Sequence, residues 1–178
     1  MAQKFASYSP TTGAITGFYD SVDSPVPTGV TALAITDTQW QVCLANSGYT
    51  VANGALVAPS ANAVLVTAQA TKVATLSQAC RATITNGFTS SALGSLHAYP
   101  STPTDQQNLT DALMSAETNA LWCEAAGVWS LVAHTVTQAV QVHTDWLTFR
   151  VAQQTRLVTI TGQVNTTTTI EGVAAFGW

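Results

Sequence analysis

The chain has 178 residues, of which 47% are hydrophobic and only 8% are charged, whereas roughly 25% of residues are charged in a typical soluble domain. This length allows one domain or two small modules and is too short for a barrel enzyme. The apolar runs fall far below the roughly 18 residues that span a bilayer, and the five tryptophans are atypical of a disordered chain. We therefore interpret the low charge as a sign that other subunits shield part of the surface in an assembly.

The charged residues and the cysteines exclude further classes of function. The net charge is −4 and the five cations are scattered, so the sequence contains no basic patch for nucleic acid. The first residues lack an apolar core of signal-peptide length, which predicts a protein made and kept in a cytoplasm. Cys43, Cys80 and Cys123 lack the paired spacing of a zinc site and are expected to be reduced and partly buried. We expect no metal and no other cofactor.

Residues 1–59 are expected to form a small β-rich module. Runs of apolar and β-branched residues, separated by turn residues, predict strands at residues 4–8, 14–19, 30–35, 49–52 and 55–58. Thr36 and Gln39 have the spacing of a capping box, which predicts a short helix after the third strand. Asn53-Gly54 predicts a two-residue hairpin turn, because both central positions of such a turn need positive φ.

Residues 60–178 are expected to form an α+β module in which helices alternate with short hairpins. Helices are predicted at residues 63–85, from 104 onward and from 136 onward, and hairpins at residues 88–99 and 121–133. Thr104 with Gln107, and Thr135 with Gln138, are interpreted as capping boxes at the starts of the last two helices. The whole fold is therefore predicted to be α+β, with a small N-terminal β-hairpin module and a long C-terminal helix.

The C-terminal helix is expected to carry the principal contact between subunits. Its apolar residues follow four-three spacing from Val136 to Val164, in a wide and partly polar stripe that suits several partners better than a strict zipper. No charged residue lies between Leu157 and Ile170, so this end is a candidate subunit contact or a segment that turns extended. The residues expected to be buried only in the oligomer are Val140, Leu147, Leu157 and Val164.

Trp122 and Trp129 lie on the second predicted hairpin of the C-terminal module. With the turn centred near Ala126 and Gly127 supplying positive φ, the two rings are expected at roughly opposing places in the paired strands. Together with the helix that begins near Thr104, this hairpin is expected to form one compact unit with a structural role.

Two sets of segments carry a resemblance to a known family. The first set is residues 8–20, residues 34–40 and Asn53-Gly54, and the second set is residues 87–100, 104–109, 122–129 and 134–138. The first set resembles the N-terminal module of bacteriophage tail-fibre assembly proteins and tail-fibre-associated proteins. The second set is similar to an uncharacterised domain that is often joined to that module in phages and prophages. Residues 59–79 depart from this pattern, because relatives tend to be charged and proline-rich there.

The resemblance implies a non-enzymatic tail protein that works beside a trimeric tail fibre. It would be a virion component in the tail, or an assembly chaperone that leaves, made in the cytoplasm of a bacterial host. Because the implied fibre is trimeric, we expect a homotrimer, with tail-fibre or other tail proteins as partners and with neither nucleic acid nor membrane insertion. The low charge favours the virion component. The resemblance supplies no catalytic residues.

An enzymatic alternative rests on Cys123 and His134, which lie on or next to one predicted hairpin. A thiol beside an imidazole is a minimal nucleophilic arrangement, but core packing between tryptophans explains Cys123 without chemistry. A metal site would need His97, His134 or His143, and no two of these share the i, i+4 face of one helix.

A glycan-binding alternative rests on aromatic side chains near polar ones. A host glycan would stack on exposed tryptophan or tyrosine rings and bind neighbouring amides and carboxylates. The densest polar group is residues 105–108, whose first explanation is helix capping and whose second is ligand contact by Asn108. The candidate platforms are Tyr99, Trp122, Trp129 and Trp178.

Overall fold

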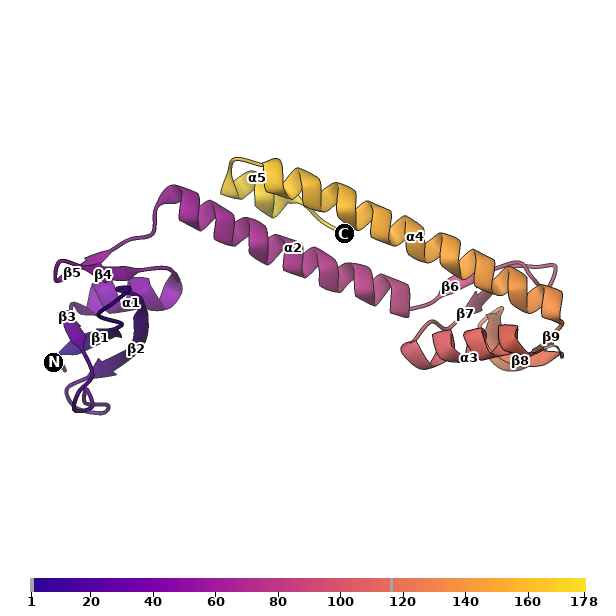
Figure 1. Cartoon of the computed structure of the whole chain (residues 1–178), viewed down its shortest axis with the longest axis horizontal. Coiled ribbons are helices and arrows are strands. Elements are labelled where there is room, and N and C mark those ends of the chain that lie inside the picture. Colours follow the sequence, from indigo (N-terminus) through magenta and orange to yellow (C-terminus); the bar gives the residue numbers. More distant parts are fainter. Residues whose placement is uncertain (1, 116) are drawn as a thin grey trace. The chain divides into compact units, whose positions relative to one another are not determined.

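The computed structural model describes residues 2–115 and 117–178, and the chain divides into two compact units, Met1–Thr67 and Ala68–Trp178. The boundary lies within helix α2 (Ala61–Thr85), which begins in the first unit and continues in the second (Figure 1). The module boundary predicted from the sequence lies just before this helix, after residue 59. The fold is α+β, as predicted, because helices and antiparallel sheets both contribute.

The first unit consists of a three-stranded antiparallel sheet in the order β2-β1-β3, a short helix and a small hairpin. Its elements before α2 are β1 (Lys4–Tyr8), β2 (Ile15–Asp20), β3 (Ala32–Ile35), α1 (Asp37–Ala45), β4 (Thr50–Ala52) and β5 (Ala55–Val57). The predicted capping box of α1 is confirmed, because Thr36 N donates to Gln39 Oε1 at 2.8 Å and Gln39 N donates to Thr36 Oγ1 at 3.1 Å. The predicted turn is confirmed by the positive φ of Asn53 and Gly54, 52° and 73°.

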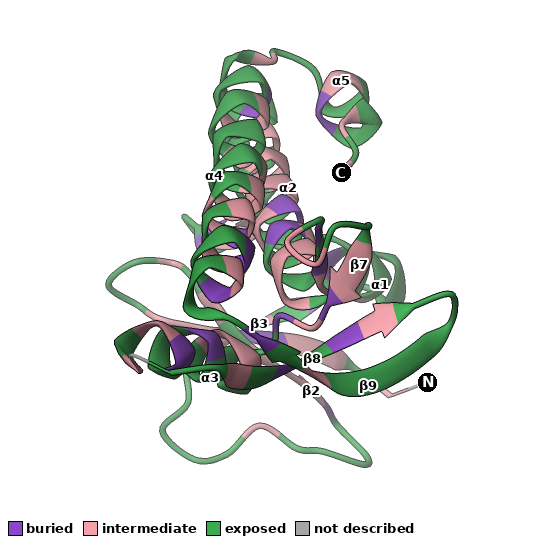
Figure 2. Ribbon diagram, turned by 90° about the vertical axis from the view of Figure 1, so that its right-hand side faces the viewer, coloured by how far each residue is buried: buried purple, intermediate pink, exposed green. Residues whose placement is uncertain are grey.

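The second unit contains a four-stranded antiparallel sheet in the order β6-β7-β8-β9, with helices packed on one face. After α2, its elements are β6 (Phe88–Ser90), β7 (His97–Tyr99), α3 (Pro103–Met114), β8 (Asn119–Ala125), β9 (Val128–His134), α4 (Val136–Thr166) and α5 (Ile170–Ala175). Figure 2 shows buried residues on α3, on β8 and on α4. The core cluster joins these elements and comprises Phe88, Tyr99, Leu109, Ala112, Leu121, Cys123, Ala139, Val142 and Trp146.

The start of α3 differs from the prediction. Its N-cap is Thr102 and not Thr104, because Pro103 lacks an N–H and its fixed φ suits the first helical position. The box is closed by Asp105, whose N–H donates to Thr102 Oγ1 at 3.3 Å while its Oδ2 accepts from Thr102 N at 3.0 Å. The interpretation of Thr104 with Gln107 as a capping box is therefore wrong.

The start of α4 follows the prediction. Thr135 N donates to Gln138 Oε1 at 2.8 Å, and Gln138 N donates to Thr135 Oγ1 at 3.3 Å. The two residues satisfy backbone donors that have no partner inside the helix.

The register of the β8-β9 hairpin separates its two tryptophans. Ala126 and Gly127 have φ of 52° and 83° and form a two-residue turn, so Ala125 pairs with Val128. Trp122 consequently pairs with Leu131, and Trp129 pairs with Glu124. The expectation that the two rings oppose each other is therefore wrong, because opposite places for residues 122 and 129 need a turn centred between Ala125 and Ala126, and the turn is centred between Ala126 and Gly127. The rings are diagonal neighbours on the face turned away from the core.

The C-terminal segment of the second unit is held against α2. Gln69 Nε2 donates to the carbonyl oxygens of Val164 and Thr167 at 3.2 and 2.9 Å, so it satisfies acceptors at the end of α4. Lys72 Nζ donates to the Ala174 and Phe176 carbonyl oxygens, each at 3.1 Å. These contacts hold α5 and the residues around it beside the two long helices of this unit (Figure 1).

Candidate functional site

The residues expected to form the subunit contact lie on different sides of α4. Val164 is completely buried within the single chain, and Leu147 packs against the core cluster. Leu157 is half-buried, and only Val140 is exposed, with 50% of its surface accessible. The expectation that all four are buried only in an oligomer therefore fails for Val164, because this side chain is already buried within the single chain. The four-three spacing fits two neighbouring stripes of the helix, and the stripe through Val142 faces the core.

A different stripe of α4 is exposed and uncharged. We call it the outer α4 strip, and its members recur three or four positions apart, which places them on one face. They are Val140, Thr144, Thr148, Val151, Thr155 and Val158, all exposed. The hydroxyls of Thr144 and Thr148 donate to the carbonyl oxygens four residues earlier, at 2.8 and 2.9 Å. These threonines therefore present methyl groups outward, beside valines that are up to 73% exposed.

The charged residues of α4 are engaged elsewhere in the unit. Asp145 accepts hydrogen bonds from Ser90 Oγ at 2.5 Å and from Gln141 Nε2 at 2.7 Å. Each of the two arginines lies over a tryptophan ring with 4.6 Å to its centroid, Arg150 over Trp146 and Arg156 over Trp178. The outer α4 strip therefore carries no charge of its own.

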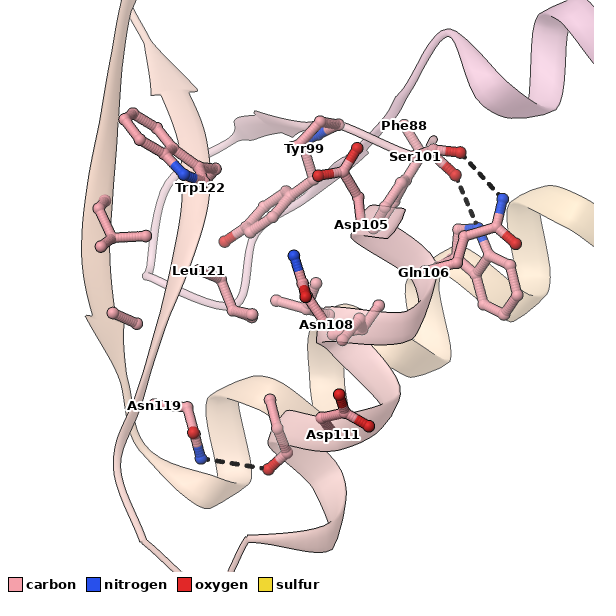
Figure 3. A pocket seen from close by; sticks show the side chains of 17 residues that line it. Phe88, Tyr99, Ser101, Asp105, Gln106, Asn108, Asp111, Asn119, Leu121 and Trp122 are labelled. Atoms are coloured by element: carbon pink, nitrogen blue, oxygen red, sulfur yellow. Dashed lines mark hydrogen bonds between the residues drawn. The ribbon is translucent and has the colours of Figure 1, made fainter. Parts of the chain in front are cut away.

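A cleft of about 320 Å³ lies between α3 and β8 (Figure 3). It forms because β7 pairs with β8 only through Ala98 and Glu124, so the first half of β8 pairs with β9 on one side and has α3 in place of a strand on the other. Its apolar wall includes the core residues Leu121 and Trp146. Trp122, 51% exposed, lines its rim. The polar side chains of the lining are Ser101, Asp105, Gln106, Asn108, Asp111 and Asn119.

Several of these polar groups hold the cleft walls in place. Trp146 Nε1 donates to Ser101 Oγ at 3.0 Å, and Gln106 Nε2 donates to the Ser101 carbonyl at 2.9 Å. Asn119 Nδ2 donates to the Ala112 carbonyl at 3.3 Å and thereby ties β8 to α3. Figure 3 shows these bonds at opposite ends of the cleft.

Other polar groups of the cleft are free to bind a ligand. The Asn108 amide has no hydrogen-bond partner among the described residues, and it points toward the middle of the cleft in Figure 3. Asp105 uses Oδ2 in the helix cap, and Asp111 accepts from Gln107 Nε2 through Oδ1 at 2.8 Å. The second oxygen of each carboxylate has no partner in the described part of the chain. No lysine or arginine lines the cleft.

Tyr99 is a buried structural residue and not an exposed platform. Only 2% of its surface is accessible, and its hydroxyl lies 2.8 Å from Nε2 of the fully buried His134. His134 Nδ1 faces the Val132 carbonyl at 2.8 Å, so Nδ1 carries the proton and Nε2 accepts from the tyrosine. Burial, with smaller contributions from Cys123 and Asp145, raises the pKa of Tyr99 far above its ordinary value.

The structure does not bring Cys123 and His134 together. Cys123 pairs with Ser130, which lies four residues before His134 on β9, and four residues of a strand span about 13 Å. Burial also raises the pKa of the Cys123 thiol, which favours the unreactive protonated form. Among the described residues, no three histidine, cysteine, aspartate or glutamate side chains are grouped to hold a metal ion.

The remaining tryptophans lie in different surroundings. Trp178 Nε1 donates to Thr83 Oγ1 at 2.6 Å and its ring lies under Arg156, so this residue fastens the C-terminus to α2. Trp129 is 50% exposed on the outer face of the sheet and does not line the cleft. Of the four candidate platforms, only Trp122 is an exposed ring beside the cleft. The sequence predicts ligand contact by Asn108 only as the second explanation of its polar group, after helix capping, and it gives no signal for Asn119, because nothing local in the sequence relates β8 to α3.

Comparisons with protein-family models, curated proteins and solved structures find no match to this chain. Within the described residues, no helix combines the length and the apolar character needed to cross a membrane.

Proposed function

We propose that the chain is a non-enzymatic bacteriophage tail protein, a tail-fibre component or fibre-associated assembly protein, that acts through protein–protein contact in the virion tail. The observation that carries the proposal is the outer α4 strip, an exposed and uncharged row of β-branched residues on a helix of 31 residues. Rows of this kind are buried against another helix in stable assemblies. The resemblance of the sequence to tail-fibre proteins and its 8% charge point in the same direction.

The partner of the outer α4 strip is a second copy of the chain. The strip runs from Val140 to Val158, which corresponds to about 27 Å of helix. Because it carries no charge, copies meet along it without like-charge repulsion. In coiled coils, β-branched residues at both core positions of the repeat favour three or four helices over two. A homotrimer therefore fits both this pattern and the trimeric fibre that the resemblance implies.

The test is the oligomeric state of the purified chain in sedimentation at micromolar concentration. The unchanged protein should sediment as a trimer, and the double variant Val151→Glu, Val158→Glu should sediment as a monomer with unchanged helical circular dichroism. The matched control is Val22→Glu, at a residue that is 68% exposed in the first unit, and it should remain trimeric. A monomeric unchanged protein, or a trimer that survives both glutamates, would overturn the self-contact.

A separate measurement addresses the place of the protein in the tail. Mass spectrometry of purified phage particles should find the chain in a fixed ratio to the fibre protein. Its absence from particles, with capture by the fibre during assembly, would identify an assembly protein instead. Absence from both would contradict the proposed function.

A further inference from the structure

We propose that the cleft between α3 and β8 binds an uncharged sugar ring of the pyranose type, in addition to the protein–protein role proposed above. The inference rests on the lining of the cleft alone and does not depend on the oligomeric state. Its volume of about 320 Å³ is at the small end of ligand sites in proteins, which span roughly 300–1,000 Å³. A single ring with its substituents suits this size better than an extended polymer.

The free polar groups match hydroxyls in number and in kind. The Asn108 amide offers a donor and an acceptor, and the unpartnered oxygens of Asp105 and Asp111 offer acceptors only. A hydroxyl both donates and accepts, so a ring edged with hydroxyls can satisfy all of these groups at once. An apolar ligand would leave the carboxylates buried without partners, which costs free energy.

The exposed Trp122 ring at the rim offers an apolar surface to a sugar, in addition to the polar groups of α3. Trp122 lines the cleft with half of its surface accessible, and its Nε1 has no hydrogen-bond partner among the described residues. Pyranose rings have apolar C–H faces, which an indole ring covers well, while the indole N–H remains available to a hydroxyl. Figure 3 shows the amide and carboxylate groups of α3 beside the cavity, and the Trp122 ring on the side of β8 away from Asn108, so the ring contributes to the rim of the cleft and not to its interior.

The charge of the lining selects among ligands. Two carboxylates and no cation line the cleft, so a phosphate, a sulfate or an acidic sugar would be repelled. A bound metal ion is disfavoured as well, because no cluster of three suitable ligands occurs in the described part of the chain. These exclusions leave uncharged and cationic ligands, and the match of the free donors and acceptors to hydroxyls favours a neutral polyhydroxylated ring among them.

The cleft is organised before a ligand arrives. The bonds from Trp146 to Ser101, from Gln106 to the Ser101 carbonyl and from Asn119 to the Ala112 carbonyl fix both walls. Binding therefore orders few side chains beyond Asn108 and Trp122, which reduces the entropic cost.

The test is saturation-transfer NMR on the full chain with glucose, galactose, mannose and N-acetylglucosamine as probes, and with gluconate and glucosamine as charged comparisons. At least one neutral sugar should give saturation transfer and a saturable shift, and gluconate should give none. Asn108→Ala and Asp111→Asn should each weaken binding about tenfold. The control Trp129→Phe, at a residue that does not line the cleft, should bind as the unchanged protein does.

Three results would overturn the proposal: no signal from any neutral sugar, equal binding of gluconate, or stronger binding of glucosamine than of every neutral sugar. Asn108 is exposed and makes no intrachain hydrogen bond among the described residues, so its replacement should leave the thermal transition unchanged. A loss of sugar binding in that variant is then a property of the site. Failure of sugar binding would leave the trimer measurement untouched, and a monomeric protein could still bind sugar, so the two proposals fail independently.

Discussion

In the second unit, α4 and the β8-β9 hairpin each have an inner and an outer face, and the two faces bury different shares of their apolar side chains. On the inner faces, Trp146 is 7% exposed and Cys123 is 1% exposed. On the outer faces, Val158 is 73% exposed and Trp129 is 50% exposed. A tryptophan has a much larger apolar surface than a cysteine, yet Cys123 is buried and Trp129 is half exposed, so the amount of apolar surface alone does not decide burial here. Burial follows from which face has neighbours within the chain, and the outer faces are available to partners.

The largest expected difference in the free energy of unfolding is between substitutions on the inner face and on the outer face of α4. Trp146→Ala should lower the free energy of unfolding by about 3–5 kcal/mol, because it removes a buried ring that also donates to Ser101. Val158→Ala, on the outer face, should change it by less than about 0.5 kcal/mol in the monomer. Urea titrations followed by circular dichroism measure both values. Similar losses in the two variants would contradict the assignment of inner and outer faces.

The inner and outer faces of the β8-β9 hairpin should also differ in how much a substitution lowers the free energy of unfolding. Cys123→Ser should cost about 1–3 kcal/mol, because it places a hydroxyl in a buried apolar position. Trp129→Ala should cost about 1 kcal/mol or less, since half of the ring is already in water.

The Cys123 thiol should also resist alkylating reagents until the protein is unfolded in urea, because burial both covers it and raises its pKa. Rapid modification of the native protein would contradict the burial of the Cys123 thiol.

Substitutions at the start of α3, which forms one wall of the cleft, should change the free energy of unfolding by a smaller amount. Thr102→Ala should cost about 1 kcal/mol, because it removes the side chain that caps the helix. Thr104→Ala should stay within about 0.5 kcal/mol, since this residue is exposed in the first turn. Thermal unfolding of the two variants distinguishes the observed cap from the one expected from sequence spacing. A larger loss at Thr104 would favour the expected cap.

Local signals were sufficient for elements whose ends are set by neighbouring residues. The capping boxes at Thr36 and Thr135 and the Asn53-Gly54 turn were predicted correctly, because each rests on backbone groups within a few positions. Thr102 was missed because two threonines flank Pro103 and both have plausible partners three residues later. The expected spacing gave no reason to prefer the residue before the proline, although the missing N–H of proline does.

Features that depend on distant segments could not be predicted in this way. A four-three pattern on α4 fits two adjacent stripes, and only the folded chain, in which Gln69 of α2 binds the Val164 carbonyl, shows that Val164 is buried. The cleft requires that β7 pair with β8 at a single position, which no local pattern encodes. Asn108 and Asn119 are both polar residues in polar surroundings, and only the fold places them on the same cavity.

The smallest expected effect concerns the edge of the inner face of α4, where His143 lies 5.8 Å from the Trp146 ring centroid. Burial, and secondarily the charge of Arg150, lowers the pKa of His143 below its ordinary value of 6.5. As the pH falls through this value, the unfolded chain binds a proton that the folded chain accepts only at lower pH. The free energy of unfolding should therefore decrease as the pH falls below about 6.5.

His143→Gln should remove this part of the pH dependence, which urea titrations between neutral and mildly acidic pH can measure. Thr144→Ala, at the neighbouring exposed position, should retain it. If the slope persists in the His143 variant, the proton is bound elsewhere, and the contact of His143 with the inner face does not govern its titration. A slope that disappears only in the trimer-breaking variant of the outer α4 strip would instead assign the titration to the contact between subunits.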